Sequence, residues 1–269
     1  MNSFWFAFGL TVLAGLATGI GSAIAFFTKK TDNRYLSVAL GFSAGVMIYI
    51  SLNQLLPSAK ETLETALGEN RGAWASIASF FGGMLLTGLI DMIVPNVENP
   101  HEFHKEQKDL NALQQAGKNP KALMRIGLLT AAVLALHNFP EGFATFISAL
   151  GDPTMAVPVA FAVALHNIPE GIAVSIPIYY ATGERKKAFL YSFASGLTEP
   201  LGALAGYFLL KPFLGDTLLG VVFAGVAGIM VYISFDELLP AAREYGKHHL
   251  CVSGLFCGMA LMAVSLTLF

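Results

Sequence analysis

Eight apolar segments occupy most of this 269-residue chain, and each is close to the length that crosses a lipid bilayer. Hydrophobic residues make up 55% of the sequence and charged residues only 13%, which is typical of integral membrane proteins. The fold class expected is therefore all-α, a polytopic membrane protein with a single transmembrane domain over residues 1–269. The predicted membrane helices span residues 4–27, 35–56, 73–94, 123–149, 155–180, 188–210, 217–239 and 250–268.

Basic residues are divided unevenly between the two sides of this predicted bundle. Thirteen Lys and Arg residues lie in the joins after the first, third, fifth and seventh helices, and three lie in the other joins. Because cytoplasmic joins are the ones rich in Lys and Arg, the loop at 95–122 is predicted to be cytoplasmic and both termini extracytoplasmic. We expect a protein of the cytoplasmic (inner) membrane that is surrounded by lipid and does not bind nucleic acid.

Two stretches far apart in the chain repeat one another. They read GVMIYISLNQLLPSA at 45–59 and GIMVYISFDELLPAA at 228–242, with nine of fifteen positions identical. In the predicted topology the second and seventh helices, which carry them, run in opposite directions across the membrane. This predicts an inverted repeat of three, two and three helices, a layout typical of secondary transporters with a site near mid-membrane.

A six-residue polar motif, His-Asn-x-Pro-Glu-Gly, occurs once in each of the two central helices, as HNFPEG at 137–142 and HNIPEG at 166–171. On a helix the His and Glu of each motif, four residues apart, lie on one face. The proline before each glutamate cannot donate a hydrogen bond, so the carbonyl four residues earlier keeps a free acceptor. Imidazole, amide, carboxylate and carbonyl groups on matching faces predict a site for a divalent cation.

Acidic side chains also mark the membrane helices. An ionised acid at the centre of such a helix costs about 3 kcal/mol on insertion scales, so these groups need protons, water or a metal cation. Glu199, which precedes Pro200, is expected to face the two motif helices. Six acids lie within the predicted helices or at their ends: Asp91, Glu141, Glu170, Glu199, Asp236 and Glu237.

Together these features resemble the ZIP (Zrt/Irt-like) family of metal transporters, and above all its bacterial zinc-uptake permeases. The resemblance rests on the eight helices, the inverted repeat, the paired motif and Glu199-Pro200. It implies a two-metal centre at mid-membrane in which Glu141 and Glu170 bridge both metals. The implied ligands are Met47, His137, Glu141, His166 and Glu170 for the principal metal, and Asn138, Glu141, Asn167, Glu170 and Glu199 for its neighbour. The implied cytoplasmic release site comprises Asp91, Glu98, Asp236 and Glu237.

Neutral imidazole and carboxylate suit Zn²⁺, and in the absence of a thiolate the same set accepts Fe²⁺, Mn²⁺, Co²⁺ or Cd²⁺. The expected function is uptake of divalent transition metals, mainly Zn²⁺, carried as cargo without a cofactor or enzymatic activity. The alternative is an intramembrane metalloenzyme such as a zinc protease, whose HExxH signature has two His where each motif here has one. The sequence leaves open a homodimer against a monomer, and metal binding by His101 and His104 against a solvated loop.

Overall fold

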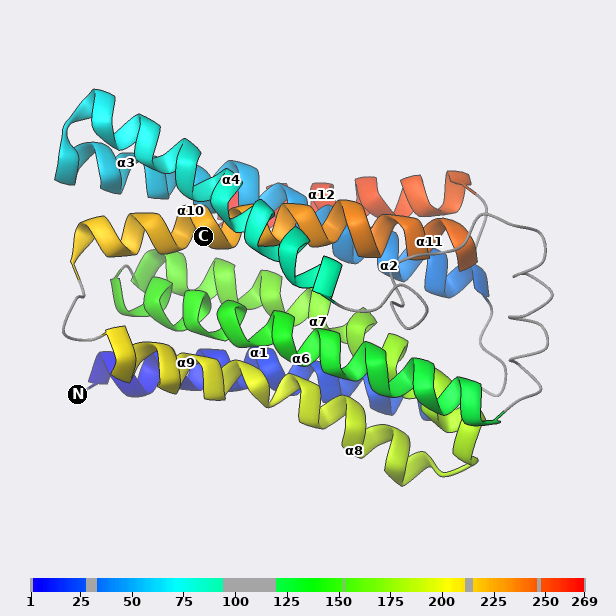
Figure 1. Cartoon of the computed structure of the whole chain (residues 1–269). Helices are drawn as coiled ribbons and strands as arrows, with labels where there is room; N and C mark the ends of the chain where they lie inside the picture. Colours follow the sequence, from blue (N-terminus) through cyan, green and yellow to red (C-terminus); the bar gives the residue numbers. More distant parts are fainter. Residues whose placement is uncertain are drawn as a thin grey trace.

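The structure is a computed structural model that describes residues 2–27, 33–93, 120–151, 153–210, 215–245 and 248–268 (Figure 1). Apart from short turns, every described segment is helical, so the prediction of an all-α fold is confirmed for this part of the chain. The elements are α1 (Asn2–Phe27), α2 (Asn33–Ile50), η1 (Ser51–Leu55), α3 (Leu56–Leu67), α4 (Glu69–Ile93), α6 (Pro120–Gly151), α7 (Pro153–Thr182), α8 (Arg185–Gly196), α9 (Thr198–Leu210), α10 (Asp216–Ile233), η3 (Ser234–Leu238), α11 (Leu239–Tyr245) and α12 (His248–Leu268), where η denotes a π-helical turn.

Membrane-spanning character is confirmed by the length and apolar composition of these helices. Within the described residues, six stretches are long and apolar enough to cross a bilayer. They are Ser3–Ala23, Ser37–Leu67, Glu69–Leu89, Ala156–Ile176, Asp216–Arg243 and His248–Leu268. Helix α6, which carries a polar motif, and the pair α8–α9, which begins with three basic residues, are not among the six. The chain is thus a multi-pass membrane protein, and a count of eight crossings stays a prediction.

Two helices differ from their predicted bounds for identifiable reasons. The helix predicted over 35–56 continues through η1 and past Pro57 to Leu67, and it ends at Gly68, whose positive φ of 86° allows the tight turn into α4. The helix predicted over 188–210 is instead two helices that meet at Leu197. Pro200 has no N–H for the carbonyl of Gly196, so the ladder is interrupted there and a new helix starts at Thr198.

Both π-helical turns lie at equivalent places in the internal sequence repeat. In each, a backbone N–H reaches the carbonyl five residues earlier: Leu56 bonds Ser51, and Leu239 bonds Ser234. A proline follows in each copy, at 57 and 240, and removes a normal helical hydrogen bond. Such turns break the regular helical ladder and frequently occur at functional sites.

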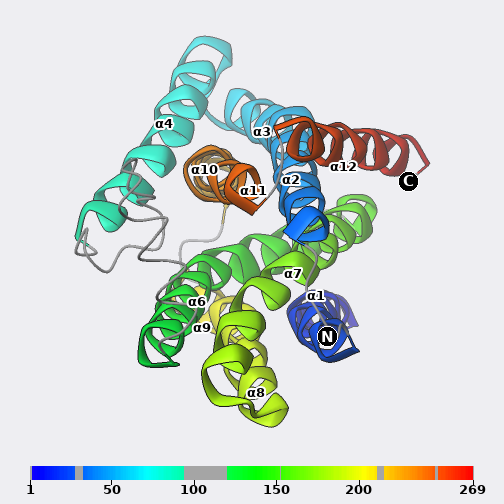
Figure 2. The ribbon, with the colours of Figure 1, turned by 90° about the vertical axis from the view of Figure 1, so that its right-hand side faces the viewer.

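The helices form two groups that Figure 2 shows end-on, with α2, α3, α4, α10, α11 and α12 in one and α1, α6, α7, α8 and α9 in the other. In the first group α2 packs along α12, and α10 along α4. Gly45 and Gly228, equivalent in the repeat, make these contacts close: an added Cβ would collide with the carbonyl of Leu255 in α12 or of Phe80 in α4. In the second group α1 packs along α7, and α9 along α6. The two groups meet chiefly where α2 lies on α7.

Candidate metal centre

The polar motifs lie in the middle of α6 and α7, the two long helices at the heart of the second group. Each proline is accommodated inside a continuous helix. Six of the predicted polar ligands have side chains that the structure describes and that are no more than 2% exposed: Asn138, Glu141, His166, Asn167, Glu170 and Glu199. Burial of so many polar groups inside an apolar bundle is costly unless they bind one another or a cation.

The glycine that ends each motif lets a neighbouring helix come close. A Cβ at Gly142 would collide with the backbone of Glu199, and one at Gly171 with the carbonyl of Thr18 in α1. The first contact brings Glu199 to α6. Glu199 lies in the first turn of α9.

Side chains from the two motifs contact one another directly. His166 Nε2 lies 2.9 Å from Glu141 Oε1, which joins the imidazole of the second motif to the carboxyl group of the first. Asn167 Nδ2 donates to Glu199 Oε1 and so connects the second motif to α9. The structure therefore gathers residues from three helices into one buried centre.

Acidic side chains outnumber basic ones in this centre. The carboxyl groups of Glu141, Glu170 and Glu199 are close enough for each to feel the others electrostatically. The sequence contains no Lys or Arg between Arg125 and Arg185, so neither motif helix supplies a basic side chain near its motif. Imidazole nitrogen, carboxylate oxygen and amide oxygen form a donor set that fits Zn²⁺ and related divalent cations.

Helix α2 covers the second motif on one side. Ser43 Oγ donates to the backbone carbonyl of His166 over 3.3 Å, so this turn of α2 lies against the motif. Met47, one turn further along α2, is fully buried in an apolar cluster that includes Ile50 and Val163. The structure thus places the predicted sulfur ligand on the helix that covers His166.

The remaining predicted site residues are placed only in part. Asp236 and Glu237 lie half-buried in η3, which packs against α2, α10 and α11. The side chains of His137 and Asp91 lie outside the described residues, as do Glu98, His101 and His104. Among the described residues, no three His, Cys, Asp or Glu side chains already form a metal-binding group.

The sequence analysis did not predict four residues of the centre: Ala14 and Gly15 in α1, and Ser195 and Gly196 in α8. Asn138 Nδ2 donates to the carbonyl of Ser195 over 3.3 Å, and Asn167 Nδ2 donates to the carbonyl of Ala14 over 2.9 Å. The glycines that follow these acceptors, Gly15 and Gly196, touch each other where α1 crosses α8. Their only signal in the sequence is the pair Gly15 and Gly19, small residues four apart in α1, which by itself indicates close helix packing.

Fold and centre together define a class: a multi-pass membrane protein with a buried, acidic, histidine-containing site between helices. A protein-family model described as ZIP zinc transporter matches residues 91–266. The chain belongs to the ZIP family, which favours a transporter over an enzyme.

Bacterial relatives match along almost the entire chain. A protein called zinc transporter ZupT from Streptococcus mutans is 56% identical and covers 98% of this chain and 97% of its own length. Proteins of the same name from Nitratidesulfovibrio vulgaris and Lysinibacillus sphaericus are each 58% identical, over 98% and 97% of this chain and 96% and 97% of their own lengths. The similarity therefore includes both motifs and both copies of the internal repeat.

Proposed function

We propose that this protein carries Zn²⁺ into the cell through the centre between α6, α7 and α9. The observation that carries the proposal is the buried contact between His166 and Glu141 beside Glu170 and Glu199, because such a set of donors stabilises a divalent cation. The names of the relatives, zinc transporters, support zinc as the main cargo.

The centre is proposed to hold two metals. Met47, His137 and His166 belong to the principal position, Asn138, Asn167 and Glu199 belong to its neighbour, and Glu141 and Glu170 bridge the two. Two divalent cations a few ångströms apart repel strongly in a low-dielectric site, and only anionic bridges offset that repulsion. The same nitrogen and oxygen donors would accept Fe²⁺, Mn²⁺, Co²⁺ or Cd²⁺.

The direction of transport follows from the proposed topology, in which the inner ends of the helices carry most of the Lys and Arg. Asp236 and Glu237 in η3, with Asp91 and Glu98, would then accept metal on the cytoplasmic side. A three-two-three inverted repeat is supported by the two π-helical turns at equivalent positions and by the equivalent contacts of Gly45 and Gly228.

Zinc uptake by liposomes that contain only the purified protein tests the function. Wild-type liposomes are expected to accumulate zinc, and Fe²⁺, Mn²⁺, Co²⁺ and Cd²⁺ to compete in proportion to their affinity. Liposomes with Glu141→Gln are the matched control, since the change keeps the shape of the side chain and removes its charge. Equal zinc entry into wild-type, Glu141→Gln and protein-free liposomes would contradict transport and return the metalloenzyme alternative to consideration.

Labelling of an introduced cysteine tests the direction. Cys251 and Cys257 are both free thiols, so they are first replaced by Ser, and Asn2→Cys is added. A thiol reagent that does not cross membranes is expected to label position 2 in intact cells. Labelling only from the cytoplasmic side would overturn both the topology and the import direction.

A further inference from the structure

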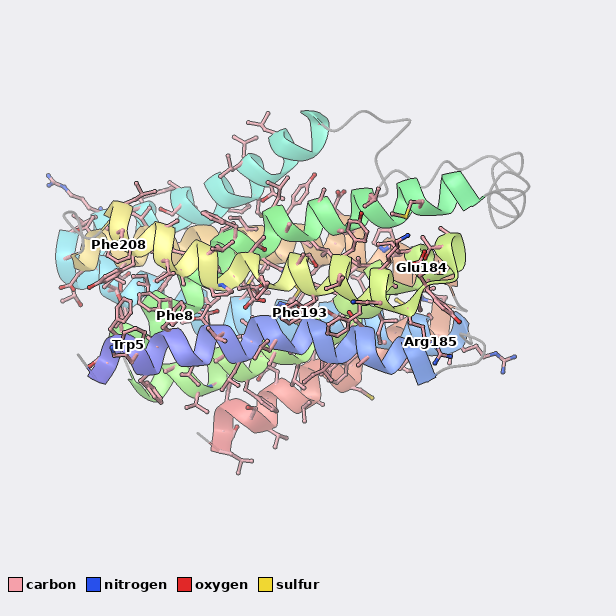
Figure 3. The ribbon with its side chains drawn as sticks, turned by 90° about the horizontal axis from the view of Figure 1, so that it is seen from below. Trp5, Phe8, Glu184, Arg185, Phe193 and Phe208 are labelled. Carbon is pink, nitrogen blue, oxygen red and sulfur yellow. The ribbon has the colours of Figure 1, made fainter. Side chains whose placement is uncertain are left out.

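Helices α1 and α8 cross at a pair of glycines. A Cβ added to Gly15 would lie 2.5 Å from the carbonyl oxygen of Gly196, and a Cβ added to Gly196 would collide in turn with the carbonyl of Gly15. Figure 3 shows α1 lying alongside α8, with Phe193 of α8 between the two ends of the bundle. The contact is reciprocal, so neither glycine can gain a side chain without moving the backbone of the other helix.

The carbonyls just before these glycines hold the two motif asparagines. Asn167 on α7 donates to the carbonyl of Ala14, and Asn138 on α6 donates to the carbonyl of Ser195. Each acceptor carbonyl belongs to the residue just before one of the two glycines. Since both amides are fully buried, the position of each acceptor carbonyl decides how its asparagine is turned.

A carboxamide has a donor end and an acceptor end, so fixing one fixes the other. With Nδ2 on a carbonyl, Oδ1 of each asparagine points from the other edge of the planar amide group. The amide nitrogen of Asn167 also donates a hydrogen bond to Glu199 Oε1. Within the described part of the chain, no group donates a hydrogen bond to Oδ1 of Asn138 or Asn167, although both atoms are buried. An oxygen in that situation is available to a cation, whereas an NH₂ group cannot bind one.

We propose that the crossing of Gly15 and Gly196 is a positioning device for the second metal. By setting the carbonyls of Ala14 and Ser195, it keeps the oxygens of Asn138 and Asn167, and not their NH₂ groups, turned toward the neighbouring metal position. The two glycines touch no cargo and act only through the asparagines. This inference rests on the proposed two-metal centre.

Replacement of Gly15 or Gly196 with alanine tests this positioning role. Gly15→Ala and Gly196→Ala should push α1 and α8 apart and release the amides, whereas Gly9→Ala is a matched control because its added Cβ meets open space on the same helix. The measurement is zinc bound per chain in purified, monodisperse protein. Wild type and Gly9→Ala should bind two zinc ions, and the crossing variants one, with at least a fivefold lower uptake rate.

Replacement of Asn138 and Asn167 with aspartate distinguishes a role in positioning the amide oxygens from a role in helix packing alone. A carboxylate offers an oxygen whichever way it turns, so Asn138→Asp with Asn167→Asp should restore the second zinc to Gly15→Ala. A purely structural defect would not be repaired. The proposal is overturned if Gly15→Ala binds two zinc ions, if it loses both while still folded, or if the aspartates leave it with one.

If neither alanine variant folds, hydrogen exchange in the wild-type protein tests the proposal instead. The side-chain NH₂ groups of Asn138 and Asn167 should exchange far more slowly than that of Asn53, which is exposed. Exchange as fast as that of Asn53 would overturn the proposal. Wild-type protein that binds fewer than two zinc ions would instead refute the proposed centre itself, which distinguishes the two failures.

Discussion

The two copies of the motif are almost identical in sequence but differ in their surroundings. In the first copy Phe139 is 43% exposed, and Leu136, just before this copy, is 63% exposed, so one side of α6 faces away from the protein. In the second copy, every residue from His166 to Gly171 except Ile168 is buried. The second copy also receives a hydrogen bond from Ser43 of α2, and the carbonyl of its Gly171 accepts one from Ser192 of α8.

This difference lies in the surroundings of the two motifs, since their sequences differ only at Phe139 and Ile168. Helix α7 packs against α1, α2, α6 and α8, whereas α6 packs against α7, α9, α1 and α8 and leaves part of its surface beside the motif exposed. In the described part of the chain, the side chain of Asn167 makes two hydrogen bonds and that of Asn138 makes one, which is longer. We therefore expect the second copy to be the fixed half of the metal centre and the first copy the more adjustable half.

The largest effect is expected from His166→Ala. This change removes a ligand and also leaves Glu141 without its 2.9 Å partner. Loss of even an outer partner of a metal ligand costs roughly 10- to 100-fold, so zinc uptake should fall by more than about 100-fold. The exposed His248, changed to Ala, is the control and should keep the wild-type rate. Wild-type uptake by both variants would remove His166 from the centre.

Acidification should produce the next largest effect. Zinc needs neutral imidazole and ionised carboxylate, so protons compete with the metal and uptake falls as external pH falls. With ordinary pKa values of about 6.5 for His and 4.3 for Glu, the rate should drop about tenfold or more between pH 7 and pH 5. Asn138→Ala should show the same profile because an amide does not titrate in this range. A rate independent of pH would argue against protonatable ligands.

The asparagines should separate the two copies. Asn167→Ala removes bonds to Ala14 and Glu199, whereas Asn138→Ala removes only the longer bond to Ser195. One additional buried hydrogen bond contributes about 1 kcal/mol, so Asn167→Ala should slow zinc uptake roughly fivefold more than Asn138→Ala. Initial uptake rates in liposomes of equal protein content provide the comparison. The reverse order would show that the first copy is the firmer one.

The smallest effect is expected at the variable position of the first copy. Phe139 is half-exposed on α6, and its side chain is not part of the proposed centre. Exposed substitutions usually change stability by no more than about 0.5 kcal/mol, so Phe139→Ala should keep uptake within roughly twofold of wild type. A large loss would mean that the outer face of α6 contacts a partner during transport.

Most of the fold could be predicted from hydrophobic length alone, because a backbone in lipid must satisfy its own hydrogen bonds and forms helices. What the sequence analysis missed was local. The extension of α2 to Leu67 is polar enough to read as a join, and the break at Leu197 depends on Pro200 three residues later. The π-helical turns were not predicted, although the repeated Leu-Leu-Pro was their signal.

The candidate ligands could be proposed from the duplicated motif, since chance does not explain five shared residues, three of them polar, at the same positions of two membrane helices. The orientation of those ligands could not. It depends on backbone carbonyls of Ala14 and Ser195, which any residue would supply, and on a crossing of helices nearly two hundred residues apart in the chain. The side chain of His137 lies outside the described residues, so its part in the centre stays a prediction.

The central claim is that carboxyl groups from both copies bridge two metals, and zinc bound per chain tests it most directly. Glu141→Gln and Glu170→Gln each keep the shape of the side chain and remove a charge that serves both metals, whereas Glu199→Gln affects one position only. Wild-type protein should bind two zinc ions, and the two bridging variants should lose two-metal occupancy and more transport than Glu199→Gln. Glu141→Gln protein that still binds two zinc ions and transports zinc at the wild-type rate would contradict the bridged centre.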